Sequence, residues 1–183
     1  IQAALDARGW TLTDILITHH HYDHIDAVDA LRGSTRVIGA AADANRLPKL
    51  DLAVQEGAEF TVAGQTTEVF DVSGHTVGHI AFYMPDAEIA FTADSLMAMG
   101  CGRLFEGSPQ VMWKSLSKLA ALPPETLVCS GHEYTAANAK FALTVDPDNA
   151  DLTNRVVEIT AMREKGKPTV ADTQFADIAT CSV

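Results

Sequence analysis

Short runs of apolar and β-branched residues recur along the chain, separated by polar stretches or turn residues. The run at 80–84 is followed by Pro-Asp-Ala and then by a second run at 88–92, which is typical of a hairpin. A Gly-Gln turn at 64–65 separates two further runs in the same way. Runs of this kind predict strands at residues 15–18, 36–39, 60–62, 67–72, 80–84, 88–92 and 126–129.

Other segments carry the spacing of amphipathic helices. In the clearest of them, Ser108 can cap a helix, Pro109 suits its first turn, and Met112, Leu116 and Leu119 follow at helical spacing. Asp26 stands where it could cap another helix. Helices are predicted at residues 1–9, 27–32, 109–120, 135–145 and 151–165.

The two kinds of element are not mixed evenly along the chain. No strand is predicted after residue 131, so we expect a mixed α and β domain at 1–133 and the start of a helical domain at 134–183. The opening residues resemble the end of a helix terminated by Gly9, so we expect the domain to begin before Ile1.

The net charge of the chain excludes some classes of binding partner. The 183 residues include 13 Lys and Arg against 24 Asp and Glu, a formal charge of −11. This balance argues against nucleic acid and anionic membranes as partners. No apolar run approaches the roughly 18 residues that a membrane-spanning helix needs.

The three cysteines indicate the compartment. They are widely spaced and odd in number, which favours a reducing compartment, and their positions are Cys101, Cys129 and Cys181. We expect a cytoplasmic monomer.

All seven histidines lie in three short stretches, each at the end of a predicted strand. The stretches are residues 18–24, 74–79 and 130–134. Loops that follow strand ends are held by a rigid sheet, so their side chains can converge in space. We expect His20 and His79 to pack behind a site built by the others rather than to bind metal. The pattern indicates no role for Glu133.

The first stretch contains the pattern HxHxDH, formed by His19, His21, Asp23 and His24. In an extended chain the first three side chains share one face, and the fourth can turn to a neighbouring position. Imidazole and carboxylate ligands suit zinc, iron and manganese. Four such ligands exceed what one tetrahedral ion takes while it keeps an open position.

The remaining histidine stretches extend this set. With His75 and His132 added, there are enough candidate ligands for two metal ions. Two close cations need a shared carboxylate, because their mutual repulsion is otherwise uncompensated. Asp94, at the end of the predicted strand 88–92, is the best candidate for this bridge.

Several longer motifs resemble the hydroxyacylglutathione hydrolase (glyoxalase II) branch of the metallo-β-lactamase superfamily. HxHxDH marks only the superfamily, whereas GCGRLFEG together with GHEYT is specific to the branch. The resemblance covers residues from about 10 to about 170, and its motifs are THHHYDH at 18–24, GHTVGHI at 74–80, FTADSL at 91–96, GCGRLFEG at 100–107 and SGHEYTAANAKFAL at 130–143.

The resemblance implies an α+β fold, a four-layer αββα sandwich followed by a helical domain. The family's first strands are expected before residue 1, and most of the helical domain beyond Val183. The resemblance also implies two divalent ions, zinc being favoured and iron or manganese being alternatives. The implied ligands are His19, His21 and His75 for the first ion and Asp23, His24 and His132 for the second, with Asp94 bridging them.

The same resemblance implies substrate-binding residues. Arg103 stands where the family has a basic residue near the glycine carboxylate of glutathione, and Tyr134 matches a tyrosine that contacts substrate. Phe105 stands where tyrosine is common. Two positions depart from the family: Asp26-Ala27 replaces a usual Gly-Gly, and Ala93 replaces the glycine before the bridging aspartate.

The implied reaction is hydrolysis of a glutathione thioester, typically S-lactoylglutathione, to glutathione and D-lactate in methylglyoxal detoxification. Asp23 and Asp94 would be the catalytic carboxylates beside a metal-bridging hydroxide. A thiolate leaves without a strong acid because its pKa is near 8.5. Three alternatives remain open: a persulfide dioxygenase with one iron, another hydrolase of this fold such as a lactonase or β-lactamase, and an inactive metal-binding fragment.

Overall fold

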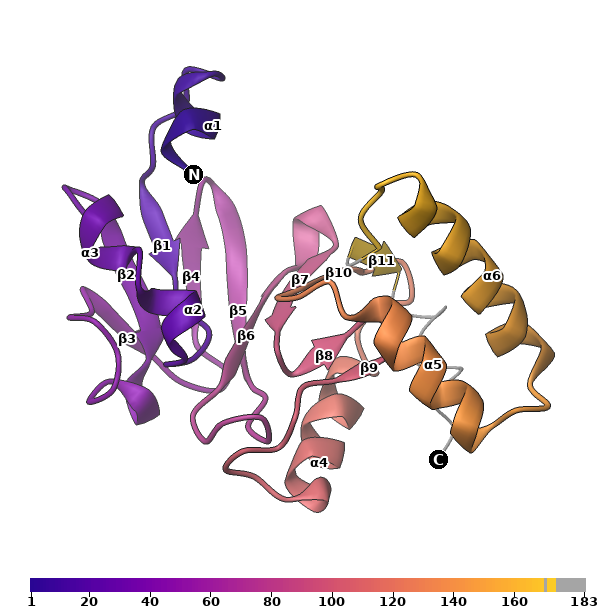
Figure 1. Ribbon diagram of the computed structural model, residues 1–183. Coiled ribbons are helices and arrows are strands. Elements are labelled where there is room, and N and C mark those ends of the chain that lie inside the picture. Colours follow the sequence, from indigo (N-terminus) through magenta and orange to yellow (C-terminus); the bar gives the residue numbers. More distant parts are fainter. Residues whose placement is uncertain (170, 174–183) are drawn as a thin grey trace.

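Two β-sheets pack against each other in the computed structural model (Figure 1). The structure describes residues 1–169 and 171–173. The smaller sheet is parallel and contains β1 (Asp14–Leu16), β2 (Arg36–Ala40) and β3 (Leu52–Val54) in that order. The larger sheet has the order β11-β10-β7-β6-β5-β4. Its strands are β4 (Glu59–Val62), β5 (Gln65–Asp71), β6 (Ile80–Met84), β7 (Ile89–Ala93), β10 (Leu127–Ser130) and β11 (Ala171–Thr173).

The main core lies between these sheets. Ile38 and Val54 of the smaller sheet pack with Val69, Ile80 and Phe82 of the larger sheet. Alternate residues of a strand point to opposite faces, so the side chains that meet here come from the inner face of each sheet. Burial of each large apolar side chain stabilises the fold by roughly 2 kcal/mol relative to exposure.

Helices cover both outer faces. Val28 of α3 (Val28–Leu31) packs on Ile17 and Val37, at the outer face of the smaller sheet. Leu119 of α4 (Pro109–Leu119) packs on Val128 and its neighbours at the outer face of the larger sheet. The order helix, sheet, sheet, helix is the αββα sandwich that the resemblance implies. The remaining helical elements of this part are α1 (Gln2–Asp6), α2 (Tyr22–Ile25), η1 (Ala41–Asp43) and η2 (Pro85–Ala87).

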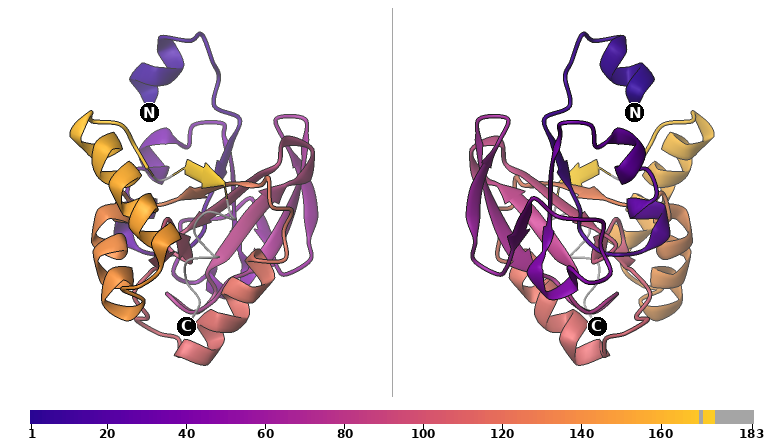
Figure 2. Two further views of the ribbon diagram at one scale, coloured as in Figure 1. Left: turned by 90° about the vertical axis from the view of Figure 1, so that its right-hand side faces the viewer. Right: turned by 90° about the vertical axis from the view of Figure 1, so that its left-hand side faces the viewer.

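A helical hairpin follows the sandwich at one side (Figure 2). α5 (Thr135–Val145) and α6 (Ala150–Glu164) bury Ala139, Leu152 and Ile159 together with Met99. Met99 lies between the short strands β8 (Leu96–Met97) and β9 (Gly100–Cys101), so this small core ties the hairpin to the sandwich. α6 begins where Asn149 accepts a hydrogen bond from the Leu152 N–H at 3.0 Å.

Two expectations about the elements were wrong. β11 lies beyond residue 131, where no strand was expected, because it pairs through its backbone with the edge of β10 and needs no apolar pattern. The expected helix 27–32 is shorter, and Asp26 does not cap it. Asp26 ends α2 instead, where its N–H donates to the Tyr22 carbonyl oxygen at 2.9 Å, and Ala27 precedes α3 without a side-chain cap.

Across the described part of the chain, no helix combines the length and the apolar character that crossing a membrane requires.

Candidate metal centre

The seven candidate ligands come from four loops and from the short helix α2, all at one end of the sandwich. Each loop follows a strand, so the sheets hold the loops in place. The first loop follows β1 and enters α2, the second follows β5, and the other two follow β7 and β10. In this order they contribute His19, His21, Asp23 and His24, then His75, then Asp94, and then His132.

The structure brings all seven side chains together in two groups. Within each group, one ligand atom from every residue lies within 4.8 Å of the others. The first group is His19, His21, His75 and Asp94, and the second is Asp23, His24 and His132.

Asp94 connects the two groups. Its Oδ2 atom lies 3.4 Å from Nε2 of His75 in the first group. The same atom lies 3.3 Å from Nε2 of His132 and 3.6 Å from Nε2 of His24 in the second group. A single carboxylate is therefore placed to balance charge on both sides, which is what a bridging ligand requires.

The spacing of the donor atoms suits bound cations and is unfavourable without them. Nδ1 of His21 and Nε2 of His75 are 2.9 Å apart, and Nε2 of His24 and Nε2 of His132 are 3.3 Å apart. Unprotonated nitrogens at such distances repel unless a cation or proton lies between them. Among the described residues, Nε2 of His19 and Oδ1 of Asp94 are buried without a hydrogen-bond partner. Leaving each such atom unsatisfied costs about 1–3 kcal/mol, and a bound ion removes that cost.

Burial sets the protonation of the first group. Desolvation, aided by the neighbouring histidines, lowers the pKa of His19, and desolvation also lowers the pKa of His21. Both rings are therefore neutral at pH 7, the form that binds metal. Burial alone would raise the pKa of Asp94, but its hydrogen bond with His24 and the histidines around it lower that pKa, so the carboxylate stays charged. The hydrogen bond with Asp94 in turn raises the pKa of His24.

Residues behind the ligands fix how the rings point. Nδ1 of His75 donates to the Arg103 carbonyl oxygen at 2.6 Å, which leaves Nε2 free toward Asp94. His79 is fully buried and stacks on His19 with the ring centroids 4.5 Å apart. Desolvation lowers the pKa of His79 to about 3, so this ring is neutral. His79 thus packs behind a ligand, as expected from the sequence.

Two glycines let the backbone approach the bridging aspartate. A Cβ atom on Gly131 would lie 2.4 Å from Oδ1 of Asp94 and 2.9 Å from Cε1 of His24. A Cβ atom on Gly102 would lie 2.0 Å from the Asp94 carbonyl oxygen. Both distances are too short for any side chain, so only glycine fits at these two positions in the centre of the site.

Comparisons with known proteins identify the family. The family model of the metallo-beta-lactamase superfamily matches residues 2–132, and that of the hydroxyacylglutathione hydrolase C-terminus matches residues 133–178. A hydroxyacylglutathione hydrolase of Ruegeria pomeroyi is 64% identical over 172 residues, which are 93% of this chain and 68% of that protein. One from Jannaschia sp. is 63% identical over 182 residues, 98% of this chain and 71% of that protein. The chain belongs to the hydroxyacylglutathione hydrolase family.

Solved structures agree with the fold. ETHE1 from Myxococcus xanthus is 32% identical with a TM-score of 0.64, over 73% of this chain and 59% of that one. TTHA1623, described as di-iron-bound, is 31% identical with a TM-score of 0.61, over 72% of this chain and 75% of that one. The chain is a metal-dependent hydrolase of the metallo-β-lactamase fold, as the sequence motifs predicted.

The expected substrate residues of this hydroxyacylglutathione hydrolase family member line a cleft beside the ligands. The cleft has a volume of about 960 Å³, and Arg103, Phe105 and Tyr134 all border it together with His21, Asp23, His75, Asp94 and His132. Phe105 meets the His21 and His75 rings edge-on, with centroids 5.4 Å apart in each case. The Arg103 guanidinium lies 5.3 Å from the centre of the Phe105 ring. Tyr134 stacks on His132 with the centroids 5.0 Å apart.

Sequence reasoning missed other residues of the site. Tyr22, Asn138 and Phe141 also line the cleft, and Tyr22 and Phe141 are largely exposed. Asn138 and Phe141 are one helical turn apart on α5, a spacing that could have indicated a shared face. Glu133, for which no role was expected, accepts hydrogen bonds from the N–H and the hydroxyl of Thr169 at 2.7 and 2.6 Å. Glu133 thereby connects the loop that carries His132 to the segment that follows α6.

Ala93, which replaces the family's usual glycine, adopts a left-handed backbone with φ 44°. That conformation strains a residue with a Cβ atom. We predict that Ala93→Gly stabilises the protein by roughly 1 kcal/mol, measured by denaturant unfolding, without changing its metal content. Ala90→Gly in the same strand is the control, because Ala90 is buried, lacks this strain and should lose stability. Equal destabilisation by both changes would disprove the strain.

Proposed function

We propose that the chain hydrolyses S-(2-hydroxyacyl)glutathione, with S-lactoylglutathione as the expected substrate and glutathione and D-lactate as products, in methylglyoxal detoxification. The observation that carries the proposal is one cleft that joins both ligand groups to Arg103, Phe105 and Tyr134. The names of the relatives from Ruegeria pomeroyi and Jannaschia sp. support the same reaction.

The residues present fit two divalent ions. Zinc is favoured, and iron or manganese remains an alternative, for which the di-iron-bound description of TTHA1623 gives support. Two ions bound by these residues would supply a hydroxide nucleophile at neutral pH and would polarise the thioester carbonyl. The proposed ligands are His19, His21 and His75 for one ion and Asp23, His24 and His132 for the other, with Asp94 between them.

The two carboxylates have different surroundings and different proposed tasks. Asp94 is buried and stays ionised among the histidines of both groups, so it offsets the positive charge of the centre. Asp23 keeps a 59% exposed side chain, with its Oδ2 atom 3.2 Å from Nε2 of His132. It faces the cleft, where it can orient the attacking water while it holds the second ion. These tasks make Asp23 and Asp94 the proposed catalytic residues.

The remaining residues bind and orient the substrate. Arg103 supplies a cation for the glycine carboxylate of glutathione, and Tyr134 supplies a hydroxyl at the same cleft. Phe105 offers only its ring, since it lacks the hydroxyl that is common at this position. The leaving thiolate has an ordinary pKa near 8.5 and departs without a dedicated acid. An amide nitrogen would need such an acid, so the site suits a thioester.

The proposal includes the organisation of the chain. The extents of the two family models support a boundary near residue 133, with the catalytic domain at 1–133 and the start of the helical substrate-binding domain at 134–183. Cys101 and Cys129 are free thiols, which supports a reducing compartment such as the cytoplasm. The net charge of −11 supports a monomer that binds a small molecule rather than nucleic acid or a membrane.

A persulfide dioxygenase is the main rival. Such an enzyme would use one iron and leave the second ligand group empty. The complete second group favours the thioester hydrolase, since Asp23, His24 and His132 have ligand atoms within 4.8 Å of one another.

The deciding experiment gives the metal-loaded protein S-lactoylglutathione and glutathione persulfide in parallel. We expect loss of the thioester with release of free thiol, and no oxygen uptake. Oxygen uptake with the persulfide and no thioester hydrolysis would establish the rival. Cleavage of a lactone or a β-lactam alone would indicate another hydrolase of this fold. Bound metal without any turnover would indicate an inactive metal-binding fragment.

Arg103→Ala should raise KM for S-lactoylglutathione about tenfold with little change in kcat, because one charge-assisted contact to the substrate is lost. Steady-state kinetics at constant ionic strength measure both constants. Arg8→Ala is the matched control, since Arg8 also lies 5.3 Å from the centre of an aromatic ring, that of Trp10, but outside the cleft. An unchanged KM in Arg103→Ala would remove Arg103 from the binding site.

A further inference from the structure

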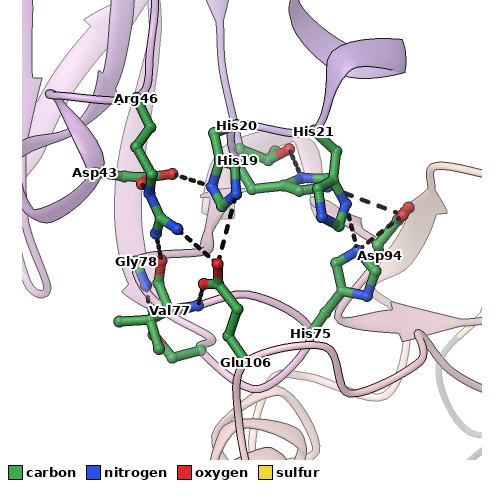
Figure 3. A network of polar contacts seen from close by, with 12 residues as sticks. His19, His20, His21, Asp43, Arg46, His75, Val77, Gly78, Asp94 and Glu106 are labelled. Carbon is green, nitrogen blue, oxygen red and sulfur yellow. Dashed lines mark hydrogen bonds and ion pairs between the residues drawn. The ribbon is translucent and has the colours of Figure 1, made fainter.

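Arg46 holds three segments of the chain together outside the metal centre (Figure 3). Its guanidinium donates to Oδ1 of Asp43 at 2.5 Å, to Oε1 of Glu106 at 2.6 Å and to the Val77 carbonyl oxygen at 2.7 Å. Asp43 is fully buried, and its other oxygen atom lies 2.9 Å from Nδ1 of His20. We call Asp43, Arg46 and Glu106 the ion-pair bridge.

The ion-pair bridge contacts two of the loops that carry candidate metal ligands. His20 lies between two candidate ligands in the sequence, so its contact with Asp43 ties the bridge to the first loop. Glu106 also accepts the Val77 N–H at 2.7 Å, which ties the bridge to the loop that carries His75. These are polar contacts between segments far apart in the sequence, and Arg46 and Glu106 are each about one third exposed.

Glu106 belongs to the loop at residues 102–107 that carries Arg103 and Phe105. The backbone of this loop is hydrogen-bonded to the metal-binding segments, with the Phe105 N–H donating to the His75 carbonyl oxygen at 3.1 Å and the Gly107 N–H donating to the Gly74 carbonyl oxygen at 3.1 Å. Glu106 adds a charged side-chain anchor between these two backbone contacts. The anchor therefore acts on the part of the loop that presents the substrate-binding side chains.

We infer that the ion-pair bridge positions the 102–107 loop for substrate binding, with Glu106 as a positioning residue. This inference rests on the proposed function. Glu106 is not among the residues that line the cleft, so it acts through Arg103 and Phe105 and not by touching the substrate. Loss of the anchor should make the loop sample other positions, which weakens binding of glutathione more than it slows the chemical step.

The chain offers a matched control for Glu106. Glu56 also accepts a backbone N–H, that of Asp71, and also pairs with a cation, Lys118, whose Nζ lies 3.0 Å from its Oε2. Glu56 does not line the cleft, and its backbone contact is to the last residue of β5 and not to the 102–107 loop. A purely structural role of a partly exposed, ion-paired carboxylate should thus appear equally in both glutamates.

The test compares Glu106→Ala and Glu106→Gln with Glu56→Ala and Glu56→Gln in the metal-loaded protein. We expect Glu106→Ala to raise KM for S-lactoylglutathione about fivefold, with kcat changed less than about twofold and the metal content unchanged. Glu106→Gln should recover part of the KM, because its amide oxygen can still accept the Val77 N–H. The Glu56 variants should leave both constants unchanged.

Hydrogen exchange supplies a readout that needs no substrate. In Glu106→Ala, the amides of Phe105 and Gly107 should exchange about fivefold faster, and in Glu56→Ala they should not. If the unaltered protein fails to hydrolyse the thioester, the proposed function fails, and the exchange rates still decide whether the bridge holds the loop. Unchanged exchange in Glu106→Ala, or a fall in kcat with unchanged KM, would overturn the inference.

Discussion

Asp94→Asn should lower kcat/KM for S-lactoylglutathione by roughly three orders of magnitude. Asparagine keeps the size of the side chain but removes the negative charge that lies 3.3–3.6 Å from His24, His75 and His132. Two cations then share a site without the carboxylate that offsets their repulsion. We therefore expect the variant to retain at most one ion per chain, measured by elemental analysis beside steady-state kinetics.

Asp26→Asn is the control for this change. Asp26 is an exposed carboxylate three residues after Asp23 and belongs to neither ligand group. The control should keep both its metal content and its rate. Full activity and two ions in Asp94→Asn would contradict the bridging role of Asp94.

Gly131→Ala should lower kcat/KM by about a hundredfold or more, although it changes no ligand. The added methyl group would lie 2.4 Å from Oδ1 of Asp94 and must displace that carboxylate or the backbone beside it. The Gly131 N–H also donates to the Ala93 carbonyl oxygen at 3.0 Å, which limits how far the backbone can move. Metal content and kcat/KM should therefore fall together in this variant.

Gly57→Ala separates this effect from the general cost of replacing glycine. Gly57 has φ +75°, so alanine is strained there, but its Cβ atom would meet nothing within 4 Å. This control should lose stability in thermal unfolding and keep its metal content and activity. If Gly131→Ala keeps its metal and rate, the close approach to Asp94 does not constrain the centre.

The sequence alone indicated which side chains converge, because each of them follows the end of a predicted strand. HxHxDH places His19, His21 and Asp23 at the end of a strand, and His75 and His132 follow other strands of the same fold. The αββα order came from the resemblance, since the apolar runs predicted strands but not their pairing. β3 and β11 were missed, and for β11 the physical reason is that it is held by backbone pairing with β10 and needs no apolar pattern.

Contacts between distant segments could not be predicted in this way. Arg46 and Glu106 are 60 residues apart, and neither stands in a pattern that suggests an ion pair. Glu133 meets Thr169 across 36 residues, by way of the helical hairpin. Such partners are set by the tertiary fold, which places polar groups side by side after the apolar pattern has fixed the elements.

The most direct test of the central claim is a metal titration of the metal-free protein, with hydrolysis of S-lactoylglutathione followed at each addition. The two ligand groups that share Asp94 predict that activity rises until two equivalents of zinc are bound per chain. Asp23→Ala and His132→Ala should stop binding at one equivalent with little activity. Full activity at one equivalent, unaffected by these two variants, would contradict a binuclear thioester hydrolase.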